Sequence, residues 1–363
     1  SSRRRHTRFR NVTGVQTCAL PIYERHLAGA VQTGGRRRFS LRINRRSRSM
    51  LHWLRSLLPQ PVETGVNAWR HEEIVTGERL QALAEVTVAT DSVLAFHRSL
   101  DPRIRRETAV FPGDHNTLNY DERIAARLRG KRSIFVYTHQ LETFARNILP
   151  ELSHRFVLVS HNSDHVVGPD FQFLLEDARV LHHFSQNAAL NHPKLTPLPI
   201  GIANAQWRHG DIAALIRASA ASGVRQQRIY CNFETATNAV VRVPLAKQLA
   251  QSPFVWHAPI RPYEQYLGDM ASCRWCLSPP GNGFDCHRTW EALYLGVTPI
   301  VQKTDFGARL HGAYPIVALD DLTDLDYAAL MKREQAFAEL APYRERLTMS
   351  YWRNEITAKM TQA

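Results

Sequence analysis

The residues best placed to do chemistry lie in the segment 277–302, LSPPGNGFDCHRTWEALYLGVTPIVQ. Its apolar ends are typical of two strands, and a Pro-Pro-Gly-Asn-Gly turn and a helix at 285–295 lie between them. Arg288 falls in the first turn of that helix, where free N–H groups already favour negative charge. Glu291 follows three residues later on the same face. A cation at a helix N-terminus suits a diphosphate and a carboxylate suits a sugar diol, so the spacing predicts a nucleotide diphosphate site.

The same spacing also has simpler explanations. Proline-glycine turns often precede helices, and an Arg–Glu pair three residues apart is commonly a surface salt bridge. The segment matches neither the dinucleotide-binding pattern G-x-G-x-x-G nor the P-loop pattern. The nucleotide site is therefore an expectation for the structure to examine.

A second anion-binding turn is predicted at the start of the C-terminal half. A strand at 228–233 and a polar loop that includes Asn238 precede a helix that carries Arg242 in its first turn. Neighbouring parallel strands end at the same edge of a sheet, so Arg242 and Arg288 can clamp one diphosphate together. Lys303 follows the next strand and either joins them or stays a surface lysine.

Polar clusters follow four successive strands of the first half, at 137–140, 160–165, 185–187 and 199–211. Such side chains are costly in a core unless they are hydrogen-bonded, so they predict a polar cleft in the first half, opposite the predicted nucleotide site. The alternative is ordinary loop chemistry, because asparagine and aspartate form turns and most loop histidines are solvated. A metal site at His161, Asp164 and His165 is a further alternative, although the cluster lacks a third well-placed ligand.

The elements that must position these residues alternate between short apolar strands and helices. Strands are expected at 86–88, 134–137, 156–160, 180–184, 198–200, 228–233, 254–257, 275–278, 299–301 and 316–319. Helices are expected at 78–84, 141–152, 239–251, 263–272, 285–295 and 322–336, with a helical link at 212–227. This alternation indicates parallel sheets covered on both faces. We expect an α/β fold with two Rossmann-like domains, 50–222 and 223–345, a cleft between them, and a C-terminal helix at 346–363.

The first 49 residues are excluded from this fold prediction. Residues 1–22 resemble a translated sequencing-adapter string, and Met50 is the expected start. Residues 1–49 hold 13 Arg and one Glu, so they account for +12 of the +13 net charge of the chain. Without them a nucleic-acid partner is not expected; a disordered basic arm is the alternative.

Neither a membrane span nor a metal or cofactor is expected. No run of about 18 apolar residues is present, and the short apolar segment 51–58 allows only peripheral membrane contact. Cys273 and Cys276 have C-x-x-C spacing across an expected helix-to-strand junction, but no second pair completes a zinc site. Because no signal peptide is evident, the cysteines are expected to be reduced in a cytoplasmic protein.

These segments together resemble the exostosin-like glycosyltransferases, glycosyltransferase family 47, which have the two-domain GT-B architecture. The pattern that carries the resemblance is P-x-G, then D-x-x-R-x-x-E-A-L, then G-x-x-P-[IV], at residues 279–300. The upstream segments SHNSD, SQN, HPKL and PIGIAN-x-QW-x-HGD resemble bacterial members and extend the likeness over about 134–317. The chain lacks the membrane anchor and disulfide framework of animal members, which favours a bacterial-type surface glycan over heparan-type substrates.

The resemblance implies a donor site in the C-terminal domain and an inverting reaction without an obligatory metal. Arg288 would contact the diphosphate of a UDP-sugar, Glu291 the ribose hydroxyls, and the glycines would permit close approach. The expected donor-binding residues are Arg288, Glu291, Arg242, Asn238, Gly281, Gly283, Asp285 and Lys303. Attack by an acceptor hydroxyl needs a base from the first domain, and the candidates are Asp164, His161 and His139.

The sequence therefore predicts a glycosyltransferase of polysaccharide biosynthesis. Its partners would be a nucleotide-sugar and a glycan or glycolipid acceptor. Two alternatives remain open. One is a metal-dependent hydrolase that uses His139, His161, Asp164 and His165. The other is a non-catalytic carbohydrate- or nucleotide-binding protein with the same fold.

Overall fold

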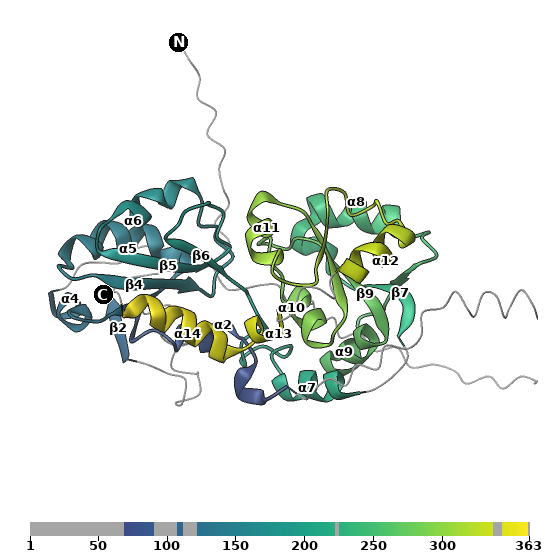
Figure 1. Ribbon diagram of the computed structural model, residues 1–363, viewed down its shortest axis with the longest axis horizontal. Helices are drawn as coiled ribbons and strands as arrows, with labels where there is room; N and C mark the ends of the chain where they lie inside the picture. The colour runs from purple at the N-terminus through teal and green to yellow at the C-terminus, as the bar shows by residue number, and fades with distance from the viewer. Residues whose placement is uncertain (1–68, 91–106, 112–121, 222–224, 337–342, 362–363) are drawn as a thin grey trace, which may run out of the picture.

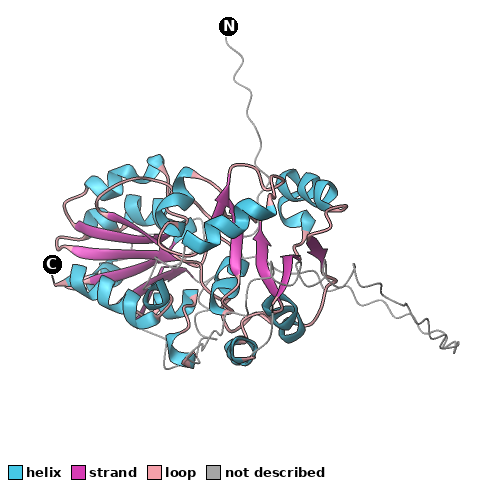
Figure 2. Ribbon diagram, turned by 45° about the vertical axis from the view of Figure 1, so that its right-hand side comes forward, coloured by secondary structure: helices cyan, strands magenta, loops and turns pink. Residues whose placement is uncertain are grey.

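The computed structural model describes residues 69–90, 107–111, 122–221, 225–336 and 343–361. The basic segment 1–49 and the apolar segment 51–58 lie outside these residues. The described chain forms two parallel sheets side by side, with helices on both faces of each (Figures 1 and 2). The predicted α/β fold with two parallel sheets is confirmed.

The first sheet has six strands in the order β2-β1-β3-β4-β5-β6, and every neighbouring pair is parallel. Its strands are β1 (Val86–Thr90), β2 (Glu107–Phe111), β3 (Ser133–Tyr137), β4 (Phe156–His161), β5 (Val180–Gln186) and β6 (Leu195–Leu198). β1, β3 and β4 are buried along their whole length. Strands covered on both faces consist mostly of consecutive apolar residues, so their positions could be predicted from the sequence.

Helices and short 3-10 turns surround this first sheet. They are η1 (His71–Glu73), α2 (Gly77–Gln81), α4 (Glu122–Leu128), η2 (Thr138–Gln140), α5 (Leu141–Asn147), η3 (Leu149–Glu151), η4 (Pro169–Phe171) and α6 (Gln172–Glu176). Phe144 of α5 and Leu174 of α6 pack in the core of one face, and Leu80 of α2 packs in the core of the other. The strand at β2 and the helices α4 and α6 were not predicted.

The second sheet has five parallel strands in the order β11-β10-β9-β7-β8. They are β7 (Gln226–Cys231), β8 (Val255–His257), β9 (Cys273–Ser278), β10 (Thr298–Gln302) and β11 (Val317–Leu319). The helices of this half are α7 (Ile212–Ala220), η5 (Thr235–Asn238), α8 (Ala239–Leu249), α9 (Tyr263–Ala271), α10 (His287–Tyr294), α11 (Asp305–His311) and α12 (Tyr327–Ala336). Trp275 of β9 packs in the core of one face, and Trp290 of α10 packs in the core of the other.

The chain ends with a return to the first sheet. After α13 (Tyr343–Arg346), helix α14 (Met349–Met360) lies across the half that contains β4 and α2 (Figure 1). Trp352 and Ile356 pack there in one core with Leu80 and Phe135. The predicted C-terminal helix therefore completes the core of the first half.

Three details of the predicted elements are corrected. β6 ends at Leu198 instead of beginning there, because the residues after it form a loop toward the other half. Helix α10 begins at His287 and not at Asp285, which leaves Asp285 in the preceding loop. Cys273 and Cys276 both lie in β9 and are buried, so they do not straddle a helix-to-strand junction.

Candidate functional site

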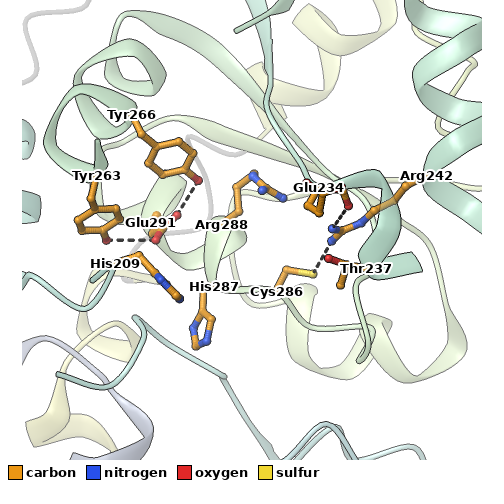
Figure 3. A pocket seen from close by; sticks show the side chains of 10 residues that line it. All are labelled: His209, Glu234, Thr237, Arg242, Tyr263, Tyr266, Cys286, His287, Arg288 and Glu291. Carbon is orange, nitrogen blue, oxygen red and sulfur yellow. Dashed lines mark hydrogen bonds between the residues drawn. The ribbon is translucent and has the colours of Figure 1, made fainter. Parts of the chain in front are cut away.

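A pocket opens at the edge of the second sheet where β7 and β9 end and α10 begins (Figure 3). Its cavity volume is about 50 Å³, and the pocket is partly open to solvent. The residues that line it are His209, Glu234, Thr237, Arg242, Tyr263, Tyr266, Cys286, His287, Arg288 and Glu291. Arg288, Glu291 and Arg242 were predicted to act together, and the structure brings them together here.

Arg288 is the cation that this pocket leaves available. Its Nε is buried and has no hydrogen-bond partner in the described part of the chain. Burial opposes its charge, but nearby Tyr266, Cys276 and Cys286 with Glu291 hold its pKa above the ordinary value, so it stays protonated. Cys286, the residue before α10, makes no side-chain cap to the first-turn N–H groups. The amide of Thr289 donates to the carbonyl of Cys286 at 3.0 Å. The charged guanidinium and the amides of His287 and Arg288 therefore remain for an anion.

Glu291 is held in place by two tyrosines. Tyr263 donates its hydroxyl to one carboxylate oxygen at 3.1 Å, and Tyr266 donates to the other at 2.7 Å (Figure 3). Burial raises the pKa of the carboxyl group, while these hydrogen bonds and Arg288 favour its charged form. Each oxygen keeps a further lone pair that a ligand hydroxyl can use.

Arg242 supports the proline-glycine loop instead of acting as a free clamp. It donates to the carbonyls of Pro280 at 2.9 Å, Pro279 at 3.1 Å and Glu234 at 2.9 Å. Asn238 donates to the carbonyl of Gly281 at 3.0 Å. Loop carbonyls have no helix or sheet partner, and these two side chains supply the donors. Both side chains therefore support the loop, and Arg242 also lines the pocket; their predicted contact with a donor stays a prediction.

The glycines of the loop allow an approach by the first half of the chain. A Cβ on Gly283 would lie 2.8 Å from Nδ2 of Asn187, which follows β5. The amide of Gly281 donates to the carbonyl of Gly283 at 2.9 Å and tightens the turn. Neither glycine lines the pocket, and Gly283 packs against the first half; their predicted contact with a donor stays a prediction.

Asp285 and Lys303 also lie outside the pocket. Asp285 is buried, and its carboxylate accepts from the amide of Ile200 at 2.7 Å and from Nε1 of Trp290 at 2.8 Å. Burial raises its pKa to about 7. Lys303 is exposed and pairs with Asp320 at 3.2 Å. Asp285 therefore ties the two halves together, and Lys303 is a surface lysine.

The polar strand ends of the first half mostly form a buried network. Nδ2 of Asn162 donates to Gln81 at 3.0 Å, and Nδ2 of Asn204 donates to Asn162 at 3.1 Å. The amide of Asn162 donates to Gln186 at 3.1 Å. These side chains satisfy one another below the surface, so this part of the predicted acceptor cleft is corrected to interior structure.

His161 belongs to this interior and is not an available base. Its ring is fully buried; Nε2 donates to the carbonyl of Pro199 at 3.0 Å, and Nδ1 accepts from the amide of Asn162 at 2.7 Å. Burial lowers its pKa to about 4, so the ring is neutral. Both nitrogens are occupied, so this structure offers no free lone pair of His161 to a substrate proton.

Asp164 and His139 also lie outside the set that lines the pocket. Asp164 accepts from Nδ2 of Asn282 at 3.2 Å, and burial raises its pKa. The ring of His139 lies 5.9 Å from that of His165. The four proposed metal ligands are not gathered at one point, and among the described residues no group of three His, Cys, Asp or Glu is arranged to hold a metal.

The pocket also contains residues that the sequence did not single out as site residues. They are His209, His287, Tyr263, Tyr266, Glu234, Thr237 and Cys286. His209 belongs to the polar cluster at 199–211 and His287 to the motif around Arg288. The sequence therefore pointed to both residues but assigned a function to neither. The two tyrosines resemble ordinary core residues of α9.

Comparison with protein-family models and with curated proteins finds no match for this chain. Within the described ranges, no helix is long and apolar enough to cross a membrane. The case for function therefore depends on the geometry of the pocket.

Proposed function

We propose that the protein is a GT-B glycosyltransferase that transfers a sugar from a nucleoside diphosphate donor to a glycan or glycolipid acceptor. The observation that carries the proposal is the charged, unpartnered Nε of Arg288 beside the uncapped N-terminus of α10. Buried polar groups are nearly always paired in folded proteins. A guanidinium without a partner inside a pocket therefore suits an anionic ligand.

The chemistry of transfer fits this arrangement. Negative charge develops on the departing diphosphate, and fixed donors placed where that charge appears lower the barrier. Arg288 and the first-turn amides of α10 would provide them. Glu291, fixed by Tyr263 and Tyr266, would accept hydrogen bonds from the ribose hydroxyls.

A second cavity lies beside the first. It shares Glu234 with the first pocket, has a volume of about 130 Å³ and is partly open to solvent. The residues that line it are Cys231, Asn232, Phe233, Glu234, Thr235, Ala246, His257, Ala258 and Ile260. A diphosphate at Arg288 would direct the base into this cavity, which combines Phe233 and Ile260 with loop backbone. The proposed donor is a UDP-sugar.

Calorimetric titration of the full-length protein with UDP and GDP, with and without EDTA, tests the proposal. We expect saturable binding of one nucleotide that is unaffected by EDTA. Arg288→Ala removes charge-assisted hydrogen bonds worth about 1.5–3 kcal/mol, so it should weaken binding by about 10–100-fold.

Lys303→Ala is the matched control, because it removes a cation of the same half that lies outside the pocket. Its affinity should equal that of the wild type. Equal affinity in Arg288→Ala, or no binding of either nucleotide by the wild type, would overturn the proposed function.

A further inference from the structure

Two imidazoles line the pocket and have no role in the proposal above. His287 and Arg288 are consecutive, and their side chains leave α10 in different directions (Figure 3). His209 comes from the first half, in the loop between β6 and α7, and its ring centroid lies 6.0 Å from that of His287. The pocket thus has a guanidinium on one side and a pair of imidazoles on the other.

The tautomer of His287 is set by its partner. Nδ1 lies 2.7 Å from the carbonyl oxygen of Gly201. A carbonyl only accepts, so Nδ1 carries the proton and Nε2 of the neutral ring carries a lone pair. Nε2 has no hydrogen-bond partner among the residues that the structure describes. An imidazole with one nitrogen fixed by a backbone carbonyl and the other free is arranged to accept a proton.

The neighbourhood of His287 keeps its ring neutral before reaction. Its pKa is lowered to about 3, chiefly by burial and to a smaller extent by His209, His161 and Arg288, while the hydrogen bond to Gly201 opposes this shift. The titratable groups that line the pocket around it are His209 from the loop before α7, Glu234 beside η5, Arg242 of α8, Tyr263 and Tyr266 of α9, Cys286, and Arg288 and Glu291 of α10. A bound diphosphate would offset the charge of Arg288, so the ring becomes more basic as negative charge grows on the leaving group.

We propose that Nε2 of His287 is the general base of the transfer, an assignment that rests on the proposed glycosyltransferase function. The acceptor oxygen attacks the anomeric carbon of the donor and forms the new glycosidic bond. The bond from that carbon to the diphosphate oxygen breaks, and its electron pair leaves with the nucleoside diphosphate. The proton of the acceptor hydroxyl moves to Nε2 and later passes to water.

His209 is the partner on the acceptor side. Its ring packs between Trp207 at 6.3 Å and Tyr263 at 6.5 Å, and no hydrogen bond holds it within the described ranges. Burial lowers its pKa, so it also remains neutral. Among the described residues that line the pocket, it is the one from the first half, so it would face an acceptor hydroxyl bound beside His287.

The decisive variant is His287→Asn. The asparagine amide can replace Nδ1–H and keep the bond to Gly201, but it places no base at the position of Nε2. The experiment measures UDP affinity by calorimetry and the release of nucleoside diphosphate from UDP-glucose, UDP-N-acetylglucosamine and GDP-mannose, with water or an oligosaccharide panel as acceptor. We expect unchanged affinity and a loss of turnover of at least about 100-fold.

The pH profile separates a base from a structural residue. Wild-type kcat should fall on the acid side as the imidazole becomes protonated, and this acid limb should disappear from the residual activity of His287→Asn. His192→Asn, a histidine outside the pocket, should keep wild-type turnover and profile. If the asparagine variant does not fold, His287→Gln serves instead, because its amide occupies the Nε2 region without being basic.

The outcomes separate the two proposals. Wild-type turnover in a folded His287 variant overturns the base and leaves the glycosyltransferase intact. Loss of turnover together with an equal loss of UDP affinity makes His287 a structural contact and also overturns the base. A wild type that binds UDP but releases none from any donor is a binding protein, and one that binds no nucleotide overturns both proposals.

Discussion

At the residue scale, the charged groups of the pocket differ in what already binds them. Arg242 donates to three backbone carbonyls, Glu291 accepts from two tyrosines, and the Nε of Arg288 donates to none of the described residues. Both arginines follow a strand and a loop, so sequence spacing cannot separate them. The difference arises from the carbonyls of Pro279 and Pro280, which lie almost forty positions from Arg242 and reach it only when the sheet has formed.

Glu291 provides a prediction at this scale. If its carboxylate binds the ribose diol, Glu291→Gln should bind UDP about 10-fold more weakly, because a charged acceptor becomes a neutral one. The same variant should bind a UDP analogue that lacks both ribose hydroxyls as weakly as the wild type does. Calorimetry with both nucleotides measures the two effects.

The control for these two affinity measurements is Glu264→Gln, which alters an exposed carboxylate of α9 that pairs with Arg217. It should leave both affinities unchanged. A wild type that does not distinguish the two nucleotides would place the ribose elsewhere.

At the element scale, the strands covered on both faces were predictable and the loops between the halves were not. β1, β3, β4 and β9 are apolar runs, and the packing of a sheet between helices dictates that pattern. The polar residues beyond β4 and β5 suggested a cleft, because solvated and mutually satisfied side chains look alike in a sequence. Only the positions of their partners, up to 81 residues away, identify them as interior.

The loop between β9 and α10 gives a prediction of its own. Gly283→Ala should destabilise the protein by about 1–3 kcal/mol, because the new Cβ would lie 2.8 Å from the amide of Asn187. Asn187 has φ of 50°, a left-handed conformation that glycine adopts without strain, so Asn187→Gly should cost little. Urea unfolding measures each variant.

The double variant tests the contact itself. Gly283→Ala combined with Asn187→Gly should recover most of the lost stability, since the clashing amide is gone. Simple additivity of the two single effects would show that the two residues do not meet.

At the scale of the whole molecule, the two sheets followed from the alternation of strands and helices, but their contacts did not. Ile200 and Asp285 are joined across 85 residues, and Gly201 and His287 across 86. No local pattern marks these pairs, because a buried aspartate or histidine is fixed by surroundings from both halves. The fold class was therefore predictable and the donor-side residues only in part.

The buried histidines predict how stability depends on pH. His161, His183 and His311 have pKa values lowered by burial to about 4, 3 and 4. The unfolded chain binds these protons near pH 6.5 and the folded chain does not. The contribution of the histidines to the free energy of unfolding is therefore fully present above that pH and is lost as the pH falls toward 4. At about 1.4 kcal/mol per pKa unit, each contributes about 3–5 kcal/mol at most. Scanning fluorimetry should show Tm falling from pH 7 to pH 4.

Asp285 has the opposite effect on the pH dependence of stability. Its pKa is raised by burial to about 7, so the folded chain holds its proton between about pH 4 and 7 and this contribution declines as the pH rises. Asp285→Asn removes the opposing effect and should make the acid loss steeper than in the wild type. A Tm that is flat or rises on acidification would contradict the assignment of neutral buried histidines.

Helix α14 has a consequence for how the chain is made. Trp352 and Ile356 cover one face of the first sheet, but about 150 residues separate them from β6, the last strand of that sheet. Ribosomes add roughly 5–20 residues per second, so α14 is synthesised on the order of ten seconds after the last strand of the sheet that it covers. Throughout that interval the face occupied by Leu80 and Phe135 is exposed to chaperones and to other nascent chains.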